Sequence, residues 1–286
     1  MRRARAWDEL GPTSGAALWI FTALVTLFLI APSLTVIVMS FNAADLLVFP
    51  PPGYSLRWYA NFFSRTEWRT AAQNSFVIAV FTTLVSTVLG TMTALGLVRG
   101  RFPGRQLATA IFLTPMVVPV IVTAVAIYGL YAKLRLVGTL LGMVMGHTVL
   151  ALPFVIINVS AVLQGVDWRL EQAARSLGAS PMRALALVTV PLIRPGIVAG
   201  ALFAFVTSFD DLVVALFVSG TRAVTLPVRM WAGIQFELNP TVAAVSANLN
   251  PVTVYANVGS AAPYTFVCAL TVIVSGAGVI VRFAPV

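Results

Sequence analysis

Residues 139–163 read TLLGMVMGHTVLALPFVIINVSAVL, an apolar run without a charged residue. A run of 18 or more apolar residues is long enough to cross the hydrocarbon core of a bilayer as an α-helix. Such runs recur along the 286-residue chain, in which 59% of the residues are hydrophobic and only 9% are charged. A soluble domain carries about 25% charged residues, so the composition predicts an all-α, polytopic membrane protein.

Six candidate membrane-spanning helices follow from these runs and form a single transmembrane domain over residues 1–286. The segment from Asn248 to Pro263 holds three asparagines and two prolines, which are unsuited to a bilayer span. Either the outer loop is extended there, or the C-terminal segment is atypical. The predicted bounds of the six helices are 16–40, 72–98, 108–132, 139–163, 195–219 and 264–282.

The arrangement of basic residues indicates how the chain is oriented. With both termini in the cytoplasm, 11 of the 18 lysines and arginines lie on the cytoplasmic side and 7 on the outer side. This bias follows the positive-inside rule. The net charge of +9 does not indicate a nucleic-acid partner, because the arginines lie between apolar spans and form no continuous basic stripe.

Small residues at four-residue spacing predict close helix packing. Gly138, Gly142 and Gly146 run down the predicted fourth span, and Gly196 opens the fifth. His147 follows the glycines, and we expect it to be a packed, hydrogen-bonded residue. It is the only histidine of the chain, so no second histidine completes a metal site, and no catalytic residues are predicted.

The predicted cytoplasmic loop of residues 164–194 is too structured for a simple connector. A first amphipathic helix is expected to end at Gly178, a common C-terminal stop. Ser180 is placed to cap a second helix that begins with Pro181, where proline is tolerated. Ala179 lies in the turn between them, and Pro191 is expected to help end the second helix. One alternative for this loop is an interfacial helix resting on the membrane.

The stretch EQAARSLG from Glu171, followed by VPL from Val190, resembles the EAA loop of ABC importer permeases. Val190 replaces the leucine that usually precedes the proline. The resemblance implies that the loop is a coupling-helix pair between helices 4 and 5, docking on an ATP-binding subunit, which is present as a dimer. The matching positions are Glu171, Ala173, Ala174, Gly178 and Pro191, with Ala179 in the joining turn.

The chain has no phosphate-binding loop for ATP of its own. A Walker A motif needs Gly-Lys before Ser or Thr, whereas the only lysine, Lys133, follows Ala132. We therefore expect no cofactor on this chain, and ATP with Mg²⁺ on the partner ATPase.

Further stretches are similar to the polyamine branch of these permeases, which handles spermidine and putrescine. The resemblance implies half of a translocation pore, completed by an identical or homologous permease subunit. It also implies a periplasmic or lipoprotein solute-binding protein and a place among the lipids of the bacterial cytoplasmic membrane. Opines, thiamine and iron chelates remain alternative substrates. The stretches are PVIVTAVAIY from Pro119, GTLLG from Gly138, HTVLALPFV from His147 and SFDDL from Ser208.

Asp210 and Asp211 fall inside the predicted fifth span. A carboxylate near the centre of a membrane helix costs about 2.5–3.5 kcal/mol, so acids there are functional candidates by default. With their neighbours Ser208 and Phe209, they are candidates for the path of a cationic substrate. The alternative is hydrogen bonding between helices. We expect Asp211 to face a helix interface or the pore.

Two other classes of membrane protein fit the sequence less well than an importer permease does. A secondary transporter typically shows internal repeats and ten or more spans, against six here. A membrane-embedded enzyme needs paired acids, histidines or metal ligands at depth, and the chain has one histidine and one adjacent pair of aspartates. An importer permease therefore remains the favoured class.

Overall fold

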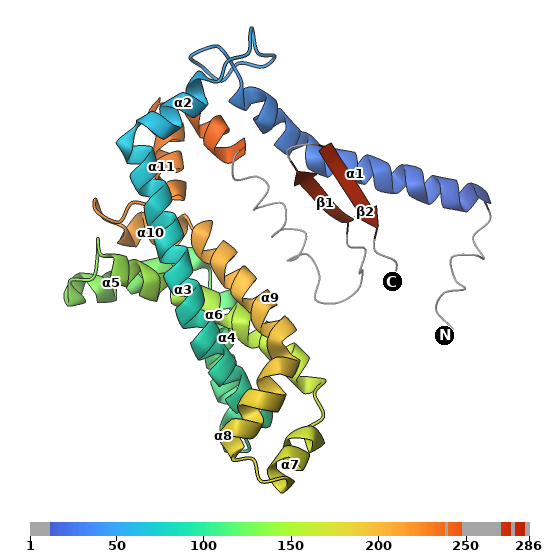
Figure 1. The fold of residues 1–286 in the computed structure, drawn as a ribbon. Helices are drawn as coiled ribbons and strands as arrows, with labels where there is room; N and C mark the ends of the chain where they lie inside the picture. The colour runs from blue at the N-terminus through green and yellow to red at the C-terminus, as the bar shows by residue number, and fades with distance from the viewer. Residues whose placement is uncertain (1–11, 238–239, 248–269, 276–277, 284–286) are drawn as a thin grey trace. The chain divides into compact units, whose positions relative to one another are not determined.

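Among the residues that the computed structural model describes, four helices are long and apolar enough to cross a membrane, and a sharply bent pair adds a fifth candidate span. The structure describes residues 12–237, 240–247, 270–275 and 278–283. The described residues are predominantly helical, as predicted (Figure 1). The chain divides into two compact units, the larger of which is centred on residues 65–232.

The larger unit is built on three long helices, α3 (Thr66–Arg99), α6 (Leu140–Gln164) and α9 (Val190–Phe209). Val155 of α6 lies against glycines of both neighbours. A Cβ added at Gly90 of α3 would lie 2.7 Å from its side chain, and one at Gly200 of α9 would lie 3.0 Å from its Cα. Small residues therefore allow close packing where these helices cross, at Gly90 and Gly200.

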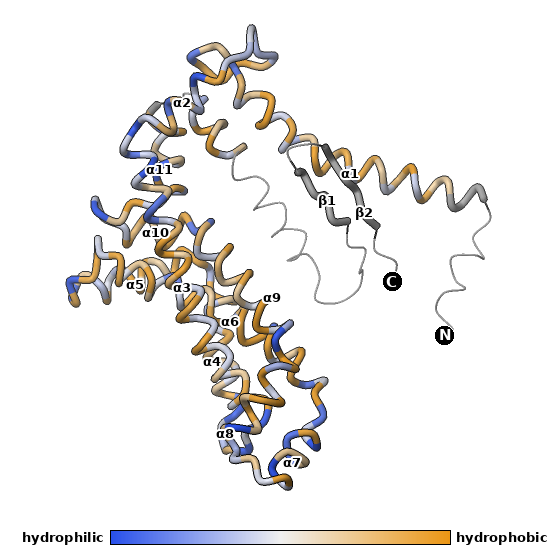
Figure 2. Tube along the Cα trace, viewed as in Figure 1, coloured by the Kyte–Doolittle hydropathy of each residue, from blue (hydrophilic) through white to orange (hydrophobic). Residues whose placement is uncertain are grey.

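Shorter helices lie at the two ends of this bundle (Figure 1). The bundle itself is mostly hydrophobic, whereas hydrophilic residues gather around α7 and α8 (Figure 2). One end carries α7 (Arg169–Ser176), α8 (Pro181–Ala184) and the π-helical turn η2 (Leu185–Thr189). The other end carries α5 (Val120–Leu134), α10 (Val213–Val218) and α11 (Leu226–Ala232).

The predicted third span, 108–132, is not one helix. The chain forms α4 (Arg105–Val117) and α5, which meet at an angle of 104°. Pro119 explains the break, because a proline ring disfavours helical backbone in the residue before it. Val118 accordingly has extended backbone, with φ −69° and ψ 133°.

The predicted fifth span, 195–219, also has different bounds. One continuous helical segment runs from Pro181 through η2 to Phe209, so Pro191 does not end a separate helix as predicted. In a regular helix its ring would clash with the carbonyl four residues earlier, and the wider π-turn before it relieves that clash. Helix α9 ends at Phe209, which places Asp210 and Asp211 in a short break before α10 rather than inside a helix.

Gly138 lies outside the fourth span, in the turn before α6. Its φ is +77°, a left-handed conformation that glycine adopts without strain. Its N–H donates to the carbonyl of Val218 at 2.8 Å. Gly138 therefore ties the start of α6 to the end of α10, whereas Gly146 lies inside α6 against Val214.

The smaller unit contains α1 (Pro12–Ser40), α2 (Arg57–Ser64) and the loop between them. The buried side chain of Asn42 organises this loop. Its amide donates to the carbonyls of Leu46 and Val48, and its side-chain oxygen accepts from the N–H of Ala44. The backbone carbonyl of Asn42 also accepts from the indole N–H of Trp58, which joins the loop to α2. This unit further includes the π-helical turn η3 (Gly233–Glu237) and a helix at 241–247.

The predicted sixth span, 264–282, differs most from the structure. Strands β1 (Leu270–Ser275) and β2 (Gly278–Phe283) pair antiparallel there, with Leu270 opposite Phe283. Residues 264–269 lie outside the described part of the chain. Runs of Thr, Val and Ile favour strands over helices, and glycine next to such runs favours a tight connection. Apolar composition alone therefore misidentified this segment as a helix.

Candidate functional site

Helices α7 and α8 are the two short helices predicted for the loop 164–194, and they lie at one end of the bundle (Figure 1). Gly178, between them, has a φ of +90°, the left-handed conformation expected of a helix stop. The hydroxyl of Ser180 accepts the backbone N–H of Arg183 at 3.3 Å and so caps α8, which begins at Pro181. The structure thus places both local signals where the sequence predicts them.

The tip of this pair carries exposed apolar side chains. Leu177 is 90% exposed and Met182 is 74% exposed. Exposed apolar side chains outside a bundle are typical of a surface that contacts another protein or the membrane. Within the predicted motif, Ala173 and Pro191 are exposed, whereas Ala174 and Ala179 are half-buried and joined by a backbone hydrogen bond of 3.1 Å.

Glu171 of α7 points back toward the bundle. Its Oε2 forms an ion pair with Nη1 of Arg99, the last residue of α3, and accepts the hydroxyl of Thr189 in η2 at 2.8 Å. Nη1 of Arg99 also lies 3.3 Å from that hydroxyl oxygen. We call these three residues the Arg99–Glu171–Thr189 node. It joins three helical elements at one point.

The surroundings of Glu171 favour its charged form. Burial raises the pKa of Glu171, but hydrogen bonds from Thr189 and Arg99 and the positive charges of Arg99 and Arg175 outweigh burial, and the pKa lies below its ordinary 4.5. The motif identified Glu171 but not its partners. Arg99 lies in a basic stretch with Arg101 and Arg105 between two predicted spans, and nothing in the sequence marked Thr189.

A second polar cluster lies at the other end of α9. Nδ1 of His147 on α6 is hydrogen-bonded to Oγ of Ser208 on α9 at 2.9 Å. Its Nε2 lies 3.6 Å from Oδ2 of Asp211. The imidazole is fully buried, and the Asp211 side chain is 8% exposed. His147 is therefore the packed, hydrogen-bonded residue that the sequence predicts, and Asp211 faces a helix interface.

Asp211 also caps the next helix. Its Oδ2 accepts the backbone N–H of Ala215 in the first turn of α10 at 3.0 Å. A carboxylate at a helix N-terminus satisfies free N–H groups and interacts favourably with the helix dipole. The His147–Ser208–Asp211 cluster thus fixes α6, α9 and α10 relative to one another.

This cluster contains the residue types of a hydrolytic triad but not the access. Ser208 is 3% exposed, so its hydroxyl is packed among helices and does not face a substrate. In the described part of the chain, no three His, Cys, Asp or Glu side chains come together to hold a metal ion. The arrangement is therefore suited to positioning helices.

Asp210 differs from Asp211 in its surroundings. It is exposed and ends α9, and its carboxylate has no hydrogen bond or ion pair among the described residues. The preceding ring of Phe209 stacks on Phe205 with centroids 5.7 Å apart. The structure therefore separates the two predicted path residues into one buried and one accessible carboxylate.

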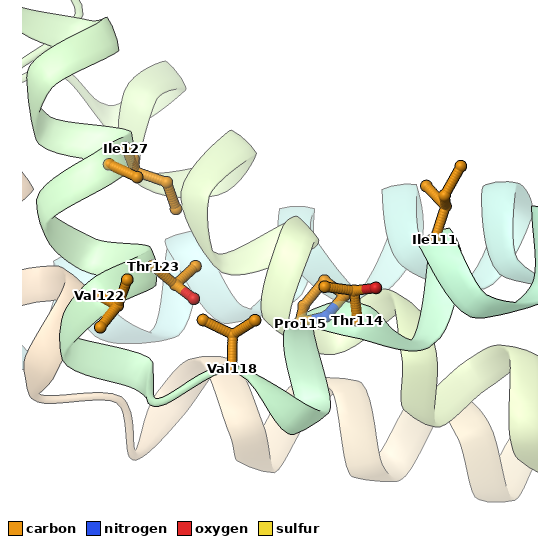
Figure 3. Close-up of a pocket in the computed structure, with 8 residues that line it drawn as sticks. Ile111, Thr114, Pro115, Val118, Val122, Thr123 and Ile127 are labelled. Atoms are coloured by element: carbon orange, nitrogen blue, oxygen red, sulfur yellow. The ribbon is translucent and has the colours of Figure 1, made fainter.

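A concavity of about 280 Å³ lies at the bend between α4 and α5 (Figure 3). Its lining is mostly aliphatic, and the hydroxyl of Thr114 already donates to the carbonyl of Ala110. None of the predicted site residues lines it. The lining residues are Ile111, Thr114, Pro115, Val118, Val122, Thr123, Ala126 and Ile127.

The region that is similar to known proteins includes both the Arg99–Glu171–Thr189 node and the His147–Ser208–Asp211 cluster. Residues 86–283 match the family described as binding-protein-dependent transport system inner membrane component. The putrescine transport system permease protein PotI of Escherichia coli (strain K12) is 33% identical over 226 residues, which are 77% of this chain and 80% of PotI. The spermidine/putrescine transport system permease protein PotC of the same strain is 31% identical over 229 residues, 80% of this chain and 86% of PotC.

The fold has a counterpart among solved structures. A chain of a bacterial ABC transporter involved in the import of the acidic polysaccharide alginate superposes with a TM-score of 0.68 and 17% sequence identity. The match covers 92% of this chain and 99% of that chain. With a coupling-helix pair, apolar bundle helices and a family match over most of its length, this chain belongs to the inner membrane components of binding-protein-dependent transport systems, as a permease subunit of an ABC importer.

Proposed function

We propose that this permease forms half of the pore of an ATP-driven importer for polyamines such as putrescine and spermidine. Asp210 carries the proposal from the structure, because its carboxylate is accessible and unpaired among the described residues. A carboxylate at the edge of an apolar bundle attracts a cation more strongly than one in open water, since the local dielectric constant is lower. The permease relatives named above transport polyamines, which are cations.

The α7–α8 pair is proposed to lie in the cytoplasm, with the N-terminus on the same side. Arg99 ends α3 and Arg105 begins α4 beside this end of the bundle, which agrees with the positive-inside rule. The membrane is then the bacterial inner membrane, whose lipids surround the apolar helices. Two ATP-binding subunits carrying ATP and Mg²⁺ dock at the coupling helices of this chain and of a second, identical or homologous permease subunit. A periplasmic or lipoprotein solute-binding protein delivers the substrate.

Uptake of radiolabelled putrescine into proteoliposomes holding the complete importer tests the substrate. We expect Asp210→Asn to lower uptake about tenfold or more, because one favourable charge interaction on the path is lost. Asp45→Asn is the matched control, since Asp45 is an exposed carboxylate that already pairs with Arg57 at 2.8 Å. If Asp210→Asn took up putrescine as fast as the wild type, this carboxylate would have no role on the path. If the wild type took up no polyamine, the proposed substrate would be wrong.

Co-purification with the ATP-binding subunit tests the docking surface. Leu177→Asp places a charge on a side chain that is 90% exposed, so it disturbs the contact without disturbing the fold. We expect this variant to lose the ATP-binding subunit. Leu56→Asp, at a side chain that is 65% exposed in the other unit, should retain it. Equal retention in both variants would place the docking surface elsewhere.

A further inference from the structure

We propose that Arg99 is the residue through which coupling helix α7 is joined to the membrane bundle, acting as a positioning residue through Glu171 and Thr189. The inference rests on the proposed docking of an ATP-binding subunit at α7–α8. It assigns to Glu171 an inward role, distinct from docking, and to Arg99 a part in transport.

Helix α7 has little other attachment to the bundle. It has only eight residues, and none of its side chains is buried. An isolated helix of this length is marginal in water. Its main neighbours among the described elements are α8 and η2, which belong to the same loop and the start of the following helix. A push on α7 would therefore be absorbed by loop movement unless a specific contact carried it to the long helices.

The Arg99–Glu171–Thr189 node supplies that contact. The Arg99 and Glu171 side chains are only 26% and 21% exposed, so their ion pair is partly shielded from water. Such charge-assisted hydrogen bonds are stronger than neutral ones, and they are weakened less by salt than exposed pairs are. Arg99 is the last residue of α3, a helix of 34 residues that spans the bundle. Displacement of Glu171 is thus passed to the end of a long, stiff element.

The π-turn η2 brings the third member into place. Thr189 is its last residue and is fully buried. A π-turn holds one more residue than a regular turn and so rotates the helix after it, and such turns are frequent at functional sites. The Thr189 hydroxyl donates to Glu171 while its oxygen lies near Arg99, so the start of α9 shares the same carboxylate. One carboxylate therefore holds α3 and the α8–α9 helix together.

Because Glu171 points toward the bundle, it has a different role from the exposed tip that follows α7. The Glu171 carboxylate is engaged by Arg99 and Thr189 within the chain, whereas Leu177 at the tip is exposed. In this proposal the exposed tip binds the ATP-binding subunit. The Arg99–Glu171–Thr189 node transmits the movement of α7 to the bundle. Variants at the two places should fail in different ways.

The test uses the complete importer in proteoliposomes and compares Arg99→Ala, Glu171→Ala and the exchange Arg99→Glu with Glu171→Arg. We expect Arg99→Ala and Glu171→Ala to retain the ATP-binding subunit at the wild-type ratio but to lower uptake per ATP hydrolysed about tenfold. The exchange variant should recover most of that loss, because the pair is restored with its ends reversed. Arg101→Ala is the matched control, at an exposed neighbouring arginine.

Three results would overturn the proposal. Arg99→Ala could leave uptake per ATP unchanged, it could release the ATP-binding subunit as Leu177→Asp is expected to do, or the exchange variant could stay as inactive as the single variants. Variants with lowered membrane levels are judged by the exchange variant alone, which must restore both level and coupling. If wild-type permease binds no ATP-binding subunit, the proposed docking fails instead, whatever the node variants do.

Discussion

Nε2 of His147 on α6 and Oδ2 of Asp211 beyond the end of α9 face each other at 3.6 Å. The opposite edge of the same imidazole is hydrogen-bonded to Ser208. One buried ring therefore connects the N-terminal part of one long helix to the end of another. This relationship explains why the two adjacent aspartates have different surroundings.

Replacement of His147 by alanine should destabilise the permease. The change removes a fully buried ring and leaves the hydroxyl of Ser208 without this partner, at a cost of about 2–4 kcal/mol. A lower unfolding temperature of the detergent-solubilised protein is the measure. Val149→Ala, at a partly exposed position of the same helix, should change that temperature far less. Equal shifts in the two variants would contradict the role of the ring.

The two aspartates should separate in a comparison of stability. Asp211→Ala removes the cap on the N–H of Ala215, and loss of such a cap costs about 1 kcal/mol. Asp210→Ala removes an exposed carboxylate and should leave the unfolding temperature near that of the wild type. A larger loss of stability in Asp210→Ala than in Asp211→Ala would show that the assignment is reversed.

Attachment of α7 should weaken in acid. Because the pKa of Glu171 is lower in the folded chain than its ordinary 4.5, the folded state favours the charged carboxylate. The stabilisation is therefore complete above pH 4.5 and is lost as the pH falls through the lower, folded-state pKa. Limited proteolysis across pH 3–6, with an acid-tolerant protease, should show cleavage near α7 increasing toward the acidic end. The Glu171→Gln variant should be cleaved to the same extent over that range. If its cleavage still increased in acid, Glu171 would not be the source of the pH response.

Gly178→Ala should distort the turn between α7 and α8 by straining its backbone. A Cβ at Gly178 would meet no atom within 4 Å, but the φ of +90° is unfavourable for alanine by about 1 kcal/mol. We expect weaker retention of the ATP-binding subunit. Gly104→Ala is a close control, with a φ of +81° and equally open space at the start of α4. The prediction fails if both variants lose the subunit to the same degree.

Gly200→Ala should loosen the bundle, whereas Gly129→Ala should not. A Cβ at Gly200 would lie 3.0 Å from the Cα of Val155, which is backbone and cannot move aside cheaply. Gly129 lies in α5 with nothing within 4 Å, so alanine there should raise helix stability by roughly 0.5–1 kcal/mol. We expect Gly200→Ala to lower the unfolding temperature and Gly129→Ala to raise it. Two shifts of the same sign would contradict the close approach of α9 to α6 at Gly200.

Local signals predicted the coupling pair well, because Gly178 and Ser180 act within a few residues of themselves. The bend at Pro119 is equally local, but the apolar composition continues across it and suggested one span. The contact of His147 with Ser208 spans 61 positions and depends on how α6 crosses α9, which no sequence pattern reports. Strands β1 and β2 were missed because apolar content alone does not separate a helix from a strand.

The exposed tip at Leu177 and Met182 has a consequence for biogenesis. A chain inserted in the bilayer before an ATP-binding subunit is present would leave this apolar surface open to chaperones and proteases. Orphan copies would then be degraded, and the abundance of the permease would follow the supply of its ATPase. Subunit stoichiometry in the cell would thus depend on the same two side chains that we propose to make the contact.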